Sequence, residues 1–498
     1  MYDIGIDLGT SAVKLLLVED SGQVVKSVSR DYPLEFPQPG WSQQNPEDWW
    51  NAILDGLSEL LLGINRVKIA GIGVAGQMHG LVALDKTGNA LRPAILWNDG
   101  RTAKETVYLN EEIGKEFLLE HTGNIAFAGF TAPKLLWMKE HEPELFAKID
   151  KVLLPKDYVN HKLTGKFTSD YSDAAGTLLL DVKNKRWSRE MLEICGLKEA
   201  QMPALHESYD VIGTLLPEIA TILNLSEEIT VVAGAGDNAA AAIGTGCLHE
   251  GQCNLSLGTS GTVFLPCEEF RMDPVKATHA FNHAAGNYHL MGCMLSAASS
   301  LKWWVEDICK STDYDILQAE ISAENLGKNY VFFLPYLMGE RAPHNDPLAR
   351  GTFVGMTMDT TQADMTQAVL EGVAFAFRDM VESARALGIT VDRCTLCGGG
   401  AKSDIWKTIL ASALNVRLDL LEEEQGPGLG GAMLSAYGRG AYASLRDAAE
   451  KNVHMAGSIS PTAELVSRYE VKYQTFQKLY PAMKEIFKTI QSGMEAKH

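Results

Sequence analysis

The sequence has no long apolar run and comparatively little positive charge. No stretch of about 18 uninterrupted apolar residues occurs, so the sequence predicts no membrane-spanning helix. The 498 residues carry 44 Lys and Arg against 63 Asp and Glu, a net charge of −19 at pH 7. That charge repels the phosphates of nucleic acids and of anionic lipids, so we expect neither as a partner.

Cysteine pairs and export signals are also lacking. Among eight cysteines the single close pair is Cys394 and Cys397, and no second pair completes a zinc tetrad. We therefore expect buried free thiols. The opening "MYDIGIDLG" enters a strand pattern with no basic region or apolar signal core before it, so we expect a cytoplasmic protein.

The familiar phosphate-binding glycine motifs are absent or lack their context. G-x-x-x-x-G-K followed by Ser or Thr does not occur. G-x-G-x-x-G occurs at residues 71–76 and 426–431. A strand and turn pattern follows Gly76 where a dinucleotide-binding fold requires a helix, and no clear strand leads into Gly426. We therefore expect neither stretch to bind a dinucleotide.

An internal repeat is the main sign of organisation. "DIGIDLGTSAVK" at residues 3–14 returns as "CNLSLGTSGTVF" at residues 253–264, and strand patterns alternate with helical ones along both halves. The sequence therefore predicts an α/β protein of two similar domains, residues 1–244 and 245–498, with a cleft between them. An amphipathic helical pattern at 463–494, interrupted at Pro481, is expected to pack on the second domain.

The repeated hairpin carries residues suited to phosphate. Glycine lets the backbone approach a polyanion closely, and Thr and Ser hydroxyls add donors. Either hairpin alone is equally an ordinary β-turn. If the two hairpins face each other across a cleft, they would hold one phosphate chain from two sides. The residues concerned are Gly9, Thr10 and Ser11 on one side and Gly258 and Thr259 on the other.

One acidic residue, Asp237, stands in the glycine- and alanine-rich run "GAGDNAAAAIGTG" at 234–246. A charge removed from water is costly unless it is paired or has a chemical task. On local sequence alone, Asp237 either caps the helix that follows it or performs chemistry.

Motifs along nearly the whole chain resemble those of the FGGY family of carbohydrate kinases. They include "DLGTSAVK", "GQMHG", "SDAAGT", "GDNAAAA", "FLPYLMGERAPH" and "LCGGGAKSDIW", while "GFTAPKLLWMKEH" and residues 351–371 fit long spaced family signatures. The resemblance implies two domains of the actin-like ATPase (ribonuclease H-like) fold and transfer of phosphate from ATP to a sugar. It is strongest to the bacterial members that act on D-xylulose.

The same resemblance implies roles for particular residues. It makes Asp237 the catalytic base for the sugar hydroxyl, a task that a carboxylate in a closed cleft can perform. It makes Met78, His79, Asp237 and Asn238 the sugar-binding residues. It makes Asp7 a second catalytic carboxylate, which organises Mg2+.

For the nucleotide, the resemblance brings Gly399 and Gly400 against the adenosine of ATP. The sequence leaves open whether a further set of residues contacts ligand or has a structural role: Lys14, Asn98, Asp99, Arg101, Trp304 and Ser403. Asp99 and Arg101 could border the sugar pocket or form an ion pair.

The expected reaction is in-line transfer from Mg·ATP to the 5-hydroxyl of D-xylulose, with closure of the domains. The alternatives are an FGGY kinase for ribulose, gluconate or glycerol, a chaperone or filament ATPase of the same fold, and an inactive sugar sensor. The motifs "GQMHG" and "GDNAAAA" argue against the ATPase, and retention of Asp7 and Asp237 argues against the sensor. Beyond small-molecule substrates, the remaining partner to consider is a second copy in a homodimer.

Overall fold

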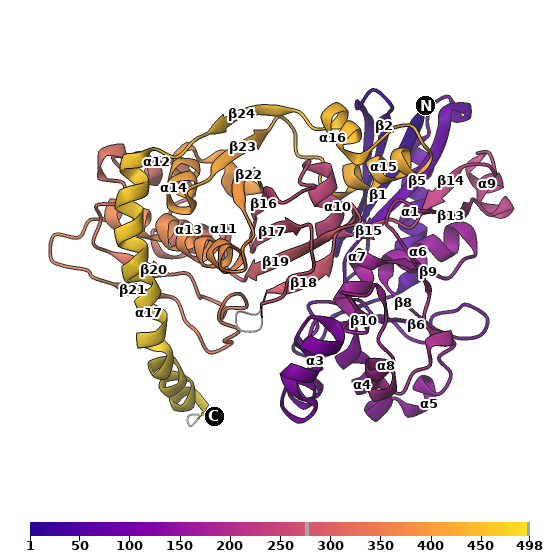
Figure 1. Cartoon of the computed structure of the whole chain (residues 1–498), viewed down its shortest axis with the longest axis horizontal. Coiled ribbons are helices and arrows are strands. Elements are labelled where there is room, and N and C mark those ends of the chain that lie inside the picture. Colours follow the sequence, from indigo (N-terminus) through magenta and orange to yellow (C-terminus); the bar gives the residue numbers. More distant parts are fainter. Residues whose placement is uncertain (274–277, 496–498) are drawn as a thin grey trace.

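The computed structural model describes residues 1–273 and 278–495, and two sheets in separate lobes organise it (Figure 1). The strands of the first sheet follow the order β13 (Val211–Thr214), β14 (Thr230–Val232), β5 (Ile69–Gly76), β1 (Tyr2–Leu8), β2 (Ala12–Glu19) and β3 (Val24–Asp31), with β15 (Ala235–Gly236) paired to β5. Those of the second follow the order β18 (His279–Asn282), β19 (Tyr288–Met294), β17 (Gly261–Cys267), β16 (Gly251–Leu257), β22 (Val391–Cys397), β23 (Arg417–Leu421) and β24 (Met455–Ile459).

The two sheets share one plan at their centres. In the first, the antiparallel hairpin β1–β2 pairs in parallel with β5, and in the second the hairpin β16–β17 pairs in parallel with β22. The repeated Gly-Thr-Ser turns join the two strands of each hairpin. The predicted α/β class is confirmed, and so is the echo between the halves.

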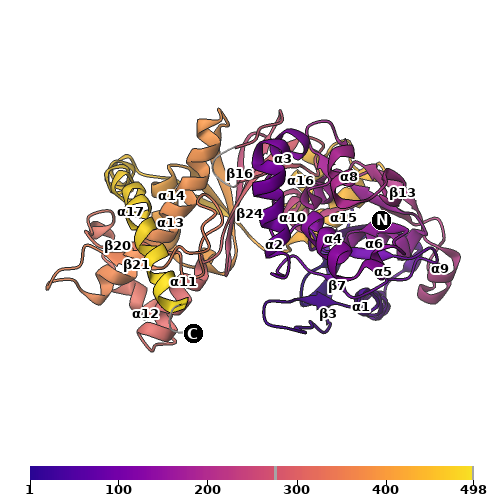
Figure 2. The same cartoon turned by 90° about the horizontal axis from the view of Figure 1, so that it is seen from below.

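Helices cover both sheets. The first sheet packs on α1 (Pro46–Leu60), and the second on α13 (Gln362–Ala386) and α14 (Asp404–Leu414), seen from two sides in Figures 1 and 2. Thr361 caps α13 through a capping box with Asp364. No helix within residues 1–273 and 278–495 is long and apolar enough to cross a membrane.

One helix from the second half of the chain lies on the first sheet. α15 (Pro427–Gly438) packs against β1 and β5, and Figure 1 shows it among the indigo strands. A Cβ at Gly5 would lie 1.9 Å from the carbonyl oxygen of Gly428, and a Cβ at Gly73 would lie 2.0 Å from that of Gly431. Glycine at these positions therefore permits close packing of helix on sheet.

This packing brings the two G-x-G-x-x-G stretches together. The expectation that no clear strand leads into the second stretch was wrong, because β23 ends at Leu421, shortly before Gly426. The intervening acidic loop, 422–426, hides that strand from a local pattern. The boundary between residues 244 and 245 stays a prediction, and the structure adds that α15 lies with the first sheet.

α15 also contacts α10 (Asp237–Gly244), which links the two halves. A Cβ at Gly430 would lie 1.9 Å from the carbonyl oxygen of Ala240, so the helices cross in backbone contact. Figure 1 shows α10 between the two sheets.

The last helix, α17 (Ala463–Glu495), packs on the second core as predicted but continues through Pro481. The expected interruption was wrong. Buried Tyr480 and Phe487 lie on either side of the proline, and their packing stabilises the helix despite one lost backbone hydrogen bond. All eight cysteines are free, as expected, but three of them, Cys293, Cys309 and Cys397, are half-buried rather than buried.

Candidate active site

A cavity of about 860 Å³ is lined by residues from both halves of the chain. The first half contributes Asp7, Lys14, Met78, His79, Asn98, Asp99, Gly129, Asp237 and Asn238, among others. The second half contributes Ser256, Ser260, Thr262, Arg341, Gly398, Glu424 and Gln425, among others. All of the residues predicted to bind sugar, and both predicted catalytic carboxylates, therefore line one cavity.

Asp237 is the first residue of α10. Its carboxylate accepts hydrogen bonds from the backbone N–H of Asn238 at 2.7 Å and from the Asn238 side-chain amide at 3.0 Å. Burial and, to a smaller extent, the negative charge of Asp7 together raise the pKa of Asp237 to about 7, against the opposing effect of the hydrogen bonds from Asn238. A carboxylate with a pKa near neutrality is well suited to accept a proton from a hydroxyl group.

The backbone just before Asp237 is fixed by a buried polar chain. The N–H of Gly236 donates to the Ser172 hydroxyl at 3.2 Å, and that hydroxyl donates to Asp170 at 2.5 Å. A Cβ at Gly236 would lie 2.9 Å from Cγ of Met78. Glycine there lets Met78 lie against the turn that carries Asp237.

Asp7 lies near the end of β1, opposite Lys14 in the β1–β2 register. Burial raises the pKa of Asp7 to about 6, and Lys14 opposes the rise. In the described part of the chain no group donates a hydrogen bond to this carboxylate, and the Lys14 ammonium donates instead to the carbonyl of Gln425 at 3.2 Å. A half-buried carboxylate with both oxygens available fits a hard cation such as Mg2+.

His79 adopts a left-handed backbone conformation, with φ of 70°. Its Nδ1 lies 2.6 Å from the carbonyl oxygen of Gly176, so Nδ1–H donates and Nε2 remains the acceptor of the ring. Burial lowers the pKa of His79 to about 3, which keeps the imidazole neutral. The ring packs beside Phe130, and Met78 adds a second apolar surface.

The two Gly-Thr-Ser turns contribute little to the cavity lining, and Gly9, Thr10 and Ser11 of the first turn do not line it. Thr10 Oγ1 accepts a hydrogen bond from the Trp97 indole at 2.9 Å. The carbonyls of Gly258 and Thr259 accept from the backbone N–H groups of residues 298 and 297. Of this second turn, Ser260 is the residue that lines the cavity. The phosphate role of Gly9, Thr10, Ser11, Gly258 and Thr259 stays a prediction.

The glycines of "CGGGAKS" differ from one another. Gly398 lines the cavity with φ of 95°, a conformation that favours glycine. A Cβ at Gly400 would lie 2.5 Å from Cδ2 of Leu257, so packing alone explains that glycine. A Cβ at Gly399 would meet no protein atom within 4 Å, so the space beside Gly399 is open to a ligand.

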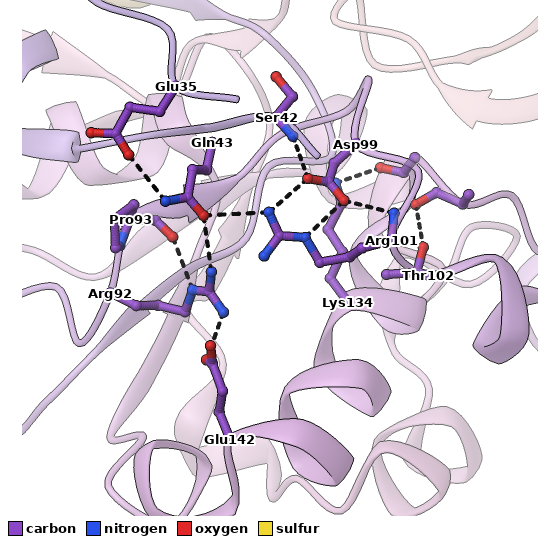
Figure 3. Close-up of polar contacts among 12 residues, drawn as sticks. Glu35, Ser42, Gln43, Arg92, Pro93, Asp99, Arg101, Thr102, Lys134 and Glu142 are labelled. Atoms are coloured by element: carbon purple, nitrogen blue, oxygen red, sulfur yellow. Dashed lines mark hydrogen bonds and ion pairs between the residues drawn. The ribbon is translucent and has the colours of Figure 1, made fainter. Parts of the chain in front are cut away.

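Asp99 and Arg101 form an ion pair. The guanidinium donates to both carboxylate oxygens, at 2.8 and 2.7 Å, and both side chains are fully buried (Figure 3). The Arg101 guanidinium lies 3.8 Å from the centre of the Trp41 ring. The structural alternative is therefore present, while Asp99 and its neighbour Asn98 also line the cavity.

Two further residues whose roles the sequence left undecided, Trp304 and Ser403, have structural contacts. The Trp304 indole donates to Thr366 Oγ1 at 2.9 Å in the second core. Ser403 caps α14, with its hydroxyl accepting from the N–H of Trp406 at 3.2 Å. These contacts account for both residues without a nucleotide.

Arg341 is a cavity residue that sequence reasoning missed. Its guanidinium donates to Nε2 of His279 at 3.1 Å and lies 5.4 Å from the centre of the Phe127 ring. Within the described residues no carboxylate comes into ion-pair distance of it. The sequence signal that could have identified Arg341 is its place in "FLPYLMGERAPH". That motif supported the family resemblance as a whole, and no role was assigned to its arginine.

Two lobes with sheets of one plan and a shared cavity lined by two half-buried carboxylates define an enzyme of the actin-like ATPase fold. The N-terminal domain model of the FGGY family of carbohydrate kinases matches residues 2–244, and the C-terminal domain model matches residues 253–439. The chain belongs to this family, whose members are ATP-dependent sugar kinases.

Individual relatives are similar over nearly the whole chain. The xylulose kinase of Escherichia coli (strain K12) is 43% identical over 482 residues, covering 96% of this chain and 98% of that protein. The solved structure of ligand-bound xylulose kinase from Lactobacillus acidophilus has a TM-score of 0.93 and 27% identity, covering 98% and 99% of the two chains. A gluconate kinase structure from Lactobacillus acidophilus has a TM-score of 0.92 and 26% identity at the same coverage.

Proposed function

We propose that this protein is a xylulokinase, which transfers the γ-phosphoryl group of ATP to the 5-hydroxyl of D-xylulose with Asp237 as the general base. The observation that carries the proposal is the position of Asp237. It is a half-buried carboxylate with a pKa near 7, at the start of α10, beside His79 and Asn238 in the shared cavity.

In this reaction Asp237 accepts the proton of the sugar hydroxyl as the oxygen forms a bond to the γ-phosphorus. The bond from that phosphorus to the bridging oxygen of ADP breaks at the same time. The two hydrogen bonds from Asn238 hold the carboxylate in place while it changes charge. Enclosure of the cavity by both lobes limits access of water, which would otherwise compete with the sugar.

Asp7 is the residue that would hold Mg2+, directly or through water. The metal ion supplies charge neutralisation on the transferring phosphates when it is bound. Lys14, Ser260 and Thr262 line the same cavity and offer donors to phosphate oxygens. Gly399 leaves room for the adenosine.

The sugar would contact Met78, His79, Asp237 and Asn238. Neutral His79 offers an acceptor at Nε2 for a hydroxyl donor, and the Asn238 amide offers both a donor and an acceptor. Met78 provides an apolar surface for the carbon chain. Likeness of fold does not select the acceptor, but the 43% identity to a xylulose kinase supports D-xylulose.

A second candidate, gluconate, is favoured by Arg341. A guanidinium with no carboxylate partner among the described residues is suited to the carboxylate of a sugar acid. The gluconate kinase structure, with a TM-score of 0.92, also supports this candidate.

The deciding experiment measures ATP consumption across D-xylulose, L-ribulose, D-ribulose, L-xylulose, gluconate and glycerol, with product mass confirmed. We expect the highest kcat/KM for D-xylulose. Asp237→Asn is the control, because turnover that survives it does not come from this site. A higher kcat/KM for gluconate would show that gluconate is the acceptor, and it would leave the proposed role of Asp237 as the base unchanged.

The proposal includes Mg2+ as the metal, the cytoplasm as the location and a homodimer as the assembly. Chelation followed by Mg2+ addition, cell fractionation and sedimentation test these three points.

A further inference from the structure

Two lysines of the first lobe, Lys134 and Lys156, are fully buried, and their surroundings differ. The ammonium of Lys156 pairs with Asp157 at 2.7 Å and with Asp170 at 3.1 Å. Lys134, on α4 (Thr131–His141), has no carboxylate within ion-pair distance in the part of the chain that is described. A buried lysine is rare without such a partner, so the contacts of Lys134 call for an explanation.

Lys134 joins two backbone segments of the cavity wall. Its Nζ donates to the carbonyl oxygen of His79 at 2.8 Å and to that of Gly129 at 2.6 Å. Thr131, one turn earlier on α4, donates its hydroxyl to the same His79 carbonyl at 3.0 Å. His79 and Gly129 both line the cavity. One turn of α4 therefore fixes the backbone of both cavity residues.

His79 needs such support because of its backbone conformation. A residue with a side chain is strained at φ of 70°, and it stays there only where its surroundings hold it. The imidazole is already fixed at one end by the Nδ1 hydrogen bond to Gly176. Lys134 and Thr131 fix the other end, the carbonyl, so the direction of Nε2 is determined from both sides.

The charge around Lys134 agrees with a donor role. Burial lowers the pKa of Lys134 well below its ordinary value, and nearby Asp99 opposes this. Figure 3 shows Lys134 pointing from its helix toward the Asp99–Arg101 pair. Even a neutral amine keeps two N–H donors, one for each carbonyl.

We propose that Lys134 is a positioning residue for sugar binding, which acts through the carbonyls of His79 and Gly129 to hold the His79 imidazole against the sugar. The inference rests on the proposed role of His79 in the sugar site. Lys134 does not touch substrate in this scheme. Its loss therefore weakens binding of the sugar and leaves binding of ATP unchanged.

The test is steady-state kinetics of the full-length protein with both substrates varied. Lys134→Met should raise the sugar KM about tenfold, because small displacements of a contacting group have large effects, and should leave the ATP KM within about twofold. Lys139→Met is the matched control, since Lys139 is an exposed lysine on the same helix, and it should change neither KM. Thr131→Val removes one donor to the same carbonyl and should raise the sugar KM about threefold.

A double-substitution cycle separates positioning from general destabilisation. In a His79→Gln background, Lys134→Met should raise the sugar KM by less than about twofold, because both changes affect the same contact. Additive effects, or an unchanged sugar KM in a folded Lys134→Met protein, would overturn the inference. If thermal unfolding shows that the Lys134→Met protein is not folded, Thr131→Val is measured with and without His79→Gln, and the same criteria are applied to its sugar KM.

Failure of the proposed function gives a different result. If wild-type protein ignores D-xylulose, the acceptor is wrong, and the same cycle is run with the preferred acceptor. If His79→Gln leaves the KM of that acceptor unchanged, the role of His79 is wrong, and the Lys134 inference falls with it. If His79→Gln raises the KM, then either an unchanged KM in Lys134→Met or additive effects in the cycle reject the Lys134 inference alone.

Discussion

The two walls of the cavity are built by different means. On the first wall, side chains are held by buried polar bonds: Asn238 holds Asp237, and Gly176 and Lys134 hold His79. On the second wall, hydroxyls and glycine backbone line the cavity, as at Ser260 and at Gly398. Under the proposed roles, acceptor chemistry would depend on fixed side chains, whereas nucleotide binding would depend on how closely the backbone can be approached.

The largest effect should come from the first wall. Asp237→Asn keeps the shape of the side chain and removes the proton acceptor, so kcat should fall by at least ~10²-fold with little change in the ATP KM. Initial rates at saturating sugar measure the effect, and thermal unfolding serves as the control for fold. Near-normal turnover in this variant would show that the first wall does not supply the base.

Low pH should reduce turnover through Asp237, which lies on the same wall. Because the pKa of Asp237 is raised to about 7, the fraction able to accept a proton falls as the pH drops below 7. We expect kcat to fall about tenfold per pH unit on the acid side of that value, with the ATP KM much less affected. A pH–rate profile at saturating substrates measures this, and a flat profile from pH 5 to 8 would contradict it.

Arg341 tests whether the second wall also contacts the acceptor. Arg341→Gln removes the guanidinium charge and retains some polarity, so the sugar KM should rise about fivefold to tenfold while the ATP KM stays unchanged. Kinetics with D-xylulose and with gluconate measure both acceptors. A larger loss with gluconate than with D-xylulose would point to carboxylate recognition, and no change with either acceptor would return the second wall to nucleotide binding alone.

The smallest effects should separate two adjacent glycines. Gly399→Ala meets no protein atom within 4 Å, so it should leave stability unchanged and raise the ATP KM about threefold by crowding the ligand. Gly400→Ala overlaps Leu257 and should lower stability by about 1–3 kcal/mol. Thermal unfolding with and without ATP distinguishes the two variants, and the reverse pattern would exchange their roles.

Local pattern predicted the elements of this molecule well. The hairpins β1–β2 and β16–β17 follow from strand alternation and from the repeated Gly-Thr-Ser turn residues. Gathering of the family-implied residues Asp7, His79 and Asp237 in one cavity agrees with the resemblance.

Long-range contacts were not predictable in the same way. Lys134 forms hydrogen bonds with carbonyls 55 residues away and 5 residues away, and carbonyl groups leave no mark on a sequence. Docking of α15 on β5 depends on glycines whose packing partners lie in the other half of the chain. Continuation of α17 through Pro481 depends on tertiary packing that outweighs a local cue.

The position of α15 also bears on biosynthesis. β1 and β5 leave the ribosome early, but the helix that covers them ends at Gly438. At roughly 5–20 residues per second, the sheet waits on the order of tens of seconds with its glycine-lined face uncovered. The first lobe therefore completes its fold only when synthesis of the second is almost finished, and a fragment that stops at residue 244 would retain an exposed apolar surface.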